Sequence, residues 1–97
     1  MNTGTPQGTA RMEIAVYPLG TGDPIVSREV SAVFEVLEAS GLRYRVGEMG
    51  ITVEGTPAEL FALAARLHDS LFGGPVRRVV TVLKLDERRD VAAPAGR

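Results

Sequence analysis

The chain has 97 residues, a formal net charge of −1 and no cysteine. This length fits one domain, which we place at residues 11–90, between a disordered N-terminal tail (1–10) and a flexible C-terminal tail (91–97). The lack of cysteine excludes disulfides, CxxC metal sites and a thiol nucleophile. The near-neutral charge provides no basic field for nucleic acid, and no apolar run approaches the roughly 20 residues of a membrane span. With no signal peptide pattern at the N-terminus, we expect a cytoplasmic protein.

The first half of the chain predicts a strand followed by a helix. Residues 11–17 alternate apolar and polar side chains, which is typical of a strand, and Pro18 is expected to end it. A helical period over residues 24–40 then predicts a helix whose N-cap is Asp23 or, with a later start, Ser27. Gly41 is placed where a left-handed C-cap is expected.

The second half predicts a hairpin, a helix and a last strand. Residues 42–47 and 51–54 alternate on either side of a tight turn, Glu48-Met49-Gly50. A capping box at Thr56-Pro57-Ala58-Glu59 starts a helix that we expect to run to about Phe72. Residues 76–86 form the last strand, which carries apolar side chains on both faces.

The resulting order, β-α-β-β-α-β, predicts an α+β ferredoxin-like fold. Its four-stranded antiparallel sheet should have the strand order 4-1-3-2, with both helices on one face. The second apolar face of the last strand then needs a cover that the monomer does not supply, so we expect a homo-oligomer through the sheet. The alternative is a pair of valines that is simply exposed.

One end of this fold collects the polar loops. The Gly20-Thr21-Gly22 loop, the Glu48-Met49-Gly50 turn and the end of the second helix should meet there. Glycines allow a close approach of the backbone to a ligand, and hydroxyl, carboxylate and free helix N–H groups could fix a polar small molecule. The alternative is that these are ordinary turn residues.

The residues that several common catalytic and binding sites require are missing from the sequence. His68 is the only histidine, so a zinc site is not expected, and no GxSxG elbow accompanies a Ser/His/Asp set. We interpret His68 as a half-buried helix residue, with catalysis as the weaker alternative. The central strands lack the aromatics of RNA-recognition domains, and the GxG at Gly20–Gly22 lacks the remaining glycines of a dinucleotide fingerprint.

Four segments together resemble the thiamine-binding protein family. They are VYPLGTG, SGLRYRVGEMGITVEG, the helix end His68-Asp69-Ser70-Leu71-Phe72, and RRVVTVLKLDERRD. The resemblance covers about residues 12–90. It implies a ferredoxin-like fold, dimers formed by sheet packing, commonly tetramers, and binding of thiamine or its hydroxymethylpyrimidine part without known catalysis.

The resemblance also implies a site. It places Thr21, Ser27, Met49, Gly50 and Thr52 near the ligand, to which the chemistry of the loops adds Gly22 and Glu48. Where the family often has threonine after Met-Gly, this chain has Ile51-Thr52, and a shift of one residue along a strand changes the face.

We therefore expect non-enzymatic binding of thiamine or hydroxymethylpyrimidine, as a carrier or sensor, with no catalytic residue, no metal and no cofactor. The expected partners are this ligand and further copies of the chain, as a homodimer through the sheet face and a homotetramer. The alternative function is an oligomeric structural or interaction module with no small-molecule ligand.

Overall fold

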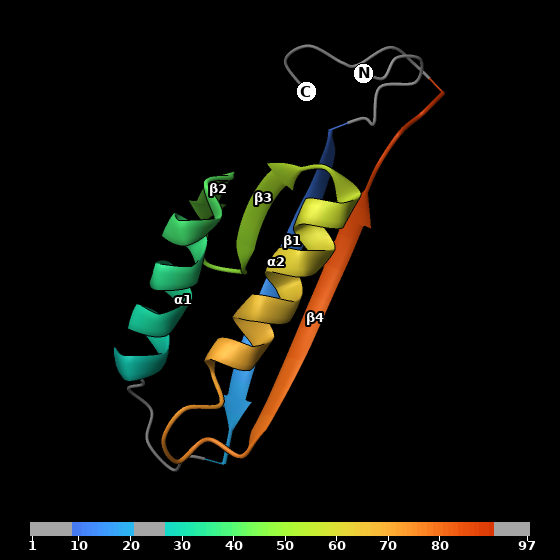
Figure 1. Cartoon of the computed structure of the whole chain (residues 1–97). Coiled ribbons are helices and arrows are strands. Elements are labelled where there is room, and N and C mark those ends of the chain that lie inside the picture. Colours follow the sequence, from blue (N-terminus) through green and yellow to red (C-terminus); the bar gives the residue numbers. More distant parts are fainter. Residues whose placement is uncertain (1–8, 21–26, 91–97) are drawn as a thin grey trace.

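The structure is a computed structural model that describes residues 9–20 and 27–90 (Figure 1). It contains six elements in the order β1 (Ala10–Leu19), α1 (Ser27–Ser40), β2 (Arg43–Val46), β3 (Ile51–Gly55), α2 (Pro57–Ser70) and β4 (Arg78–Asp86). The four strands form one sheet with the order β2-β3-β1-β4, and every neighbouring pair is antiparallel. The predicted fold class, strand order and antiparallel pairing are confirmed.

The core lies between the sheet and the helices, which form a layer over one of its faces (Figure 1). The inward residues of β1 and β3 alternate with outward ones, as the period of two requires. The core side chains that are almost fully removed from solvent come from two strands, β1 and β3, and from both helices: Met12, Ile14, Leu37, Val53, Leu60, Leu63 and Leu67. The apolar stripe of α2 therefore covers the central strands, β1 and β3, and α1 packs beside α2 and adds Leu37 to the same core.

The ends of the helices follow from local chemistry. Thr56 caps α2 by accepting from the Glu59 backbone N–H, while the Glu59 carboxylate accepts from the Thr56 N–H at 2.9 Å. Gly41 follows the last residue of α1 with a φ of 73°, as the C-cap prediction requires. α1 is described from Ser27, which lies within the helix and is not the N-cap that the later predicted start made it, and Asp23 lies outside the described residues.

The predicted boundaries of α2, β4 and β1 differ from the observed ones by up to two residues. α2 ends at Ser70 rather than near Phe72, because Leu71 and Phe72 make the closing turn to the His68 and Asp69 carbonyls. β4 begins at Arg78, two residues later than predicted. β1 starts at Ala10 and continues through Pro18 to Leu19, opposite Arg78. The expectation that Pro18 ends the strand was wrong.

Proline is compatible with this strand because only one of its edges is paired at that point. Pro18 lies opposite Val79 of β4, whereas the pairing of β1 with β3 already ends at Ile14 and Ile51. A proline whose missing N–H would point away from the paired neighbour costs no ladder hydrogen bond. The sequence shows the proline, but it does not show that β1 is paired on one side only at this position.

The face of the sheet opposite the helices, which we call the open face, has two halves. Near the start of β1 it carries charges of both signs, including the ion pairs Arg11–Glu54 at 3.7 Å and Lys84–Glu13 at 3.8 Å. The other half is an apolar patch, which comprises Ala15, Tyr17, Leu19, Val80 and Val82. Val82 is 52% exposed and Tyr17 48% exposed in the single chain. The alternation predicted for the last strand is confirmed, and its second apolar face is open.

Candidate functional site

Three of the predicted site residues lie together in the turn between β2 and β3. Glu48 and Met49 are exposed, and Met49 is 83% exposed, the largest value among the exposed apolar side chains of the described residues. The Gly47 N–H donates to the Gly50 carbonyl at 2.8 Å and closes the turn. The turn therefore presents a carboxylate and a flexible thioether to solvent on a fixed backbone.

Gly50 fixes this turn against β1. Its φ is 151°, in the region that favours glycine, and a Cβ built on it would lie 2.9 Å from the Ile14 carbonyl oxygen and 3.6 Å from the Ala15 Cβ. Neither the backbone angle nor the contact leaves room for a side chain. Glycine is thus required here by the close approach of two backbones.

Thr52 lies on the open face of the sheet. It faces Arg45 on β2 and Glu13 on β1, while its neighbours Ile51 and Val53 are buried under the helices. The displacement of the hydroxyl to the other face, expected from the Ile51-Thr52 order, is what the structure shows. Glu48, Met49 and Gly50 are brought together, and Thr52 is set apart from the helix layer.

The first loop is only partly described. Thr21 and Gly22 lie outside the described residues, and Ser27 is the first residue of α1. Gly20, at the end of β1, lies five residues beyond Ala15, which is roughly 16 Å of extended chain. The hairpin turn, whose Gly50 lies beside Ile14 and Ala15, therefore lies back along β1 from Gly20 rather than level with it.

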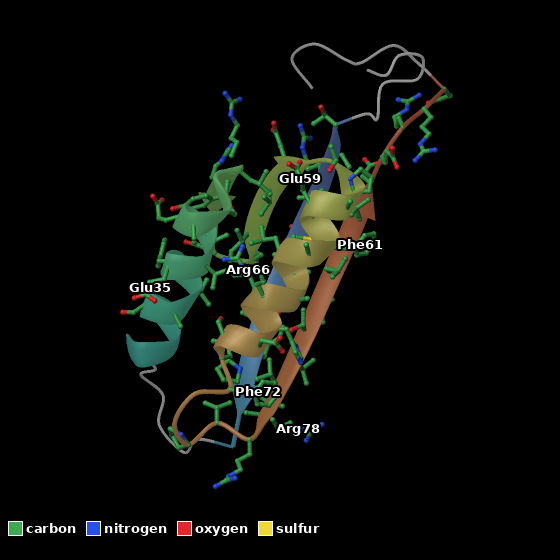
Figure 2. The ribbon with its side chains drawn as sticks, viewed as in Figure 1. Glu35, Glu59, Phe61, Arg66, Phe72 and Arg78 are labelled. Carbon is green, nitrogen blue, oxygen red and sulfur yellow. The ribbon has the colours of Figure 1, made fainter. Side chains whose placement is uncertain are left out.

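His68 is held between α2 and β4. Its Nδ1 is 2.7 Å from the Thr81 hydroxyl oxygen, and its ring meets the edge of the Phe72 ring with centroids 5.4 Å apart. Phe72 lies at the end of the molecule where α2 finishes and β4 begins at Arg78 (Figure 2). A half-buried residue with a fixed hydrogen bond agrees with the structural interpretation of His68, although its partner is a side chain of β4 that the sequence pattern did not single out.

A second polar pair, which the sequence pattern did not predict, joins α1 to β2. The Tyr44 hydroxyl donates to the Glu38 carboxylate, across the short connection between these elements. This hydrogen bond, with smaller contributions from burial and from the carboxylate charge, raises the pKa of Tyr44 above its usual value of 10.0. The hydrogen bond between Tyr44 and Glu38 thus connects the edge strand β2 to the helix α1.

We expect Tyr44 to titrate at higher pH than an ordinary tyrosine. In a Tyr17→Phe background Tyr44 is the only tyrosine, so phenolate absorbance follows this group alone. Since the folded-state pKa is the higher one, the pair stabilises the fold below pH 10, and this contribution is lost as the pH rises through the folded pKa. Adding Glu38→Gln should bring the titration back toward the usual value, and an unchanged midpoint would contradict the pairing.

Residues 9–20 and 27–90 contain neither a metal-binding group of side chains nor a membrane-spanning helix. No group of three or more histidine or acidic side chains is placed to hold a metal ion. Neither helix is long and apolar enough to cross a membrane.

Comparison with known proteins identifies relatives along most of the chain. A family model described as "Thiamine-binding protein" matches residues 12–96. The UPF0045 protein YqgV of Bacillus subtilis is 34% identical over 82 residues, which cover 80% of this chain and 79% of that protein.

Solved structures share the fold. Hypothetical protein MJ1052 from Methanocaldococcus jannaschii is 31% identical with a TM-score of 0.76, over 90% of this chain and 88% of that one. A protein from Thermotoga maritima described as a candidate thiamine biosynthesis/salvage protein, TM0486, is 25% identical with a TM-score of 0.70, over 82% and 84%. The resemblance first recognised in four sequence segments thus extends over nearly the whole length, and the chain belongs to the thiamine-binding protein family.

Proposed function

We propose that this protein binds thiamine or its hydroxymethylpyrimidine part as a carrier or sensor and does not transform it. The observation that carries the proposal is the family match over residues 12–96. The turn at Glu48-Met49-Gly50 supports it, because an exposed acceptor and a polarizable thioether stand on a turn that Gly50 holds close to β1. The likeness to the Thermotoga maritima protein agrees with a thiamine-related role.

Binding without catalysis is part of this proposal. A structural role of His68 agrees with it, since the ring joins α2 to β4 through the Thr81 hydroxyl and packs against Phe72. We propose a cytoplasmic location for this carrier or sensor.

Isothermal titration calorimetry with thiamine and, separately, with hydroxymethylpyrimidine tests this function. We expect heat of binding with at least one of them, and recovery of the ligand chemically unchanged after incubation. No heat with either, at protein concentrations in the high micromolar range, would contradict ligand binding. Conversion of the ligand would contradict the non-enzymatic role.

We also propose that two copies pack through their open faces, and that such dimers associate into a homotetramer. The apolar patch supports the first step, because its side chains are half exposed in the single chain and contiguous across β1 and β4. The charged half of the face carries both signs, so two copies related by a twofold axis can match opposite charges. If no small molecule binds, this same surface favours an oligomeric interaction module as the second candidate function.

Val82→Asp is expected to convert the oligomer to smaller species in sedimentation velocity. A buried, unpaired carboxylate at the centre of an interface costs several kcal/mol, which is more than a hundredfold in association. The matched control is Phe61→Asp, because Phe61 is 56% exposed but belongs to α2, in the layer on the other side of the sheet (Figure 2). A wild-type chain that sediments as a monomer would refute the packing.

A further inference from the structure

The strand β1 extends beyond the end of its pairing with β3. Its pairing with β3 ends at Ile14 opposite Ile51, whereas its pairing with β4 continues to Leu19 opposite Arg78. Figure 1 shows β1 and β4 running on as a two-stranded ribbon past the hairpin of β2 and β3. From Ala15 to Leu19, β1 therefore has a described strand paired on one side alone.

The geometry at Gly50 identifies which backbone groups face the unpaired side. The Ile14 carbonyl oxygen points at the hairpin, since a Cβ on Gly50 would lie 2.9 Å from it. In an extended strand the N–H and C=O of one residue point the same way and alternate from residue to residue. The backbone groups of Val16 therefore point to the same side as those of Ile14, just beyond the turn.

No described residue pairs with the Val16 backbone on that side. The ladder with β3 has ended, and the backbone hydrogen bonds of the turn stay within it, from Gly47 to Gly50. The Val16 side chain packs against the core, so the backbone of this residue is held in place. Val16 thus offers one donor and one acceptor side by side, as a strand offers them to its neighbour.

We propose that the aminopyrimidine ring of the ligand takes the place of the missing strand at Val16. The inference rests on the proposed function and names the backbone groups that would form hydrogen bonds with the ring. An exocyclic amino group donates to the Val16 carbonyl, and the adjacent ring nitrogen accepts from the Val16 N–H. The exposed apolar side chain of Met49, next to Gly50 in the turn that lies beside Ala15, is available to cover the ring.

Recognition by backbone explains a feature of the site. Among the described residues, the polar side chains gathered there are few, and Thr52 is on the opposite face of the sheet. A donor and an acceptor fixed by a packed strand lose little entropy on binding. Selectivity would then rest on the amino group and ring nitrogen and not on a charged side chain.

Nuclear magnetic resonance of the full ¹⁵N-labelled chain tests the contact directly. Addition of hydroxymethylpyrimidine should shift the Val16 amide and slow its hydrogen exchange. The Ala15 amide, which faces β4, is the internal control and should change little. An analogue in which a methyl group replaces the amino group should bind at least tenfold more weakly.

Two substitutions separate the N–H from the side chain. Val16→Pro removes the donor at a position where no described strand uses it, and is expected to weaken hydroxymethylpyrimidine binding at least tenfold. Val16→Ala also loses the packing of the valine side chain but keeps the N–H, and should retain the affinity within about threefold. This small change is distinguishable from the tenfold loss expected for Val16→Pro. Circular dichroism verifies that each variant is folded. If Val16→Pro is unfolded, the test rests on the chemical shift of the wild-type Val16 amide and on the affinity for the methyl analogue.

The outcomes are distinguishable. No heat with thiamine or hydroxymethylpyrimidine on the wild-type chain overturns the proposed function and this inference with it. Two results overturn the inference alone when the wild-type chain does give heat of binding. One is a Val16 amide whose chemical shift does not change, and the other is equal affinity for hydroxymethylpyrimidine and its methyl analogue.

Discussion

Gly50→Val is expected to lower the free energy of unfolding by about 3 kcal/mol, because it combines backbone strain with a steric clash. Gly50 has a φ of 151°, and its missing Cβ would lie 2.9 Å from a backbone oxygen of Ile14. Backbone atoms of a central strand cannot move aside as the end of a flexible side chain can. Urea denaturation followed by circular dichroism measures the change.

Gly47→Ala is the matched control within the same turn. A Cβ at Gly47 would meet its nearest neighbour, the Gly50 carbonyl oxygen, at 3.5 Å, which is an ordinary contact. We expect a change of about 0.5 kcal/mol or less, since no close contact or positive φ stands in its way. Equal stability of the Gly50 and Gly47 variants would show that the turn does not depend on the approach to Ile14. The Gly50 variant should also lose ligand binding, since it displaces the turn from β1.

Leu67→Ala is expected to cost about 3 kcal/mol of unfolding free energy. Leu67 lies in the cluster between α2 and the central strands and is 0% exposed, so truncation removes buried apolar surface and leaves a cavity. In a domain of this size the total stability is of order 5–15 kcal/mol, and the loss is a large part of it. The measurement is the midpoint and slope of urea unfolding, with an unchanged slope required for the interpretation.

Phe61→Ala on the same helix provides the contrast. This substitution removes a larger side chain from a position that is 56% exposed, and we expect a loss of about 1 kcal/mol or less. Burial rather than side-chain size should therefore decide the order of the two effects. A larger loss for Phe61→Ala than for Leu67→Ala would mean that the core is not where the structure places it.

Much of the fold could be predicted from local pattern. The period changes between two and 3.6 along the chain, and the capping box at Thr56 and the C-cap at Gly41 fixed helix ends that the structure confirms. These signals are local, because each depends on residues within one turn of helix or one strand. The order of elements then left few topologies, and the predicted strand order is the observed one.

For the candidate site, the sequence indicated turn residues and strand faces but not the partners that they meet. The glycine at Gly50 could be recognised from the sequence as a turn residue, and the face of Thr52 followed from the alternation of β3. The partner of His68 could not be found in this way, because Thr81 is thirteen residues away on another element and carries no motif. Likewise Tyr44 and Glu38 meet only because α1 ends directly above β2.

By itself, the sequence determined the elements, their order and the two-sided apolar character of the last strand. Only the tertiary structure decided how far each pair of strands runs. Pro18 looked like the end of a strand, yet β1 continues through it, because that edge has already lost its partner. Register and strand length depend on contacts between distant segments, such as that of Gly50 with Ile14, and no local pattern encodes where such a contact stops the pairing. The unpaired backbone at Val16 exists for this reason.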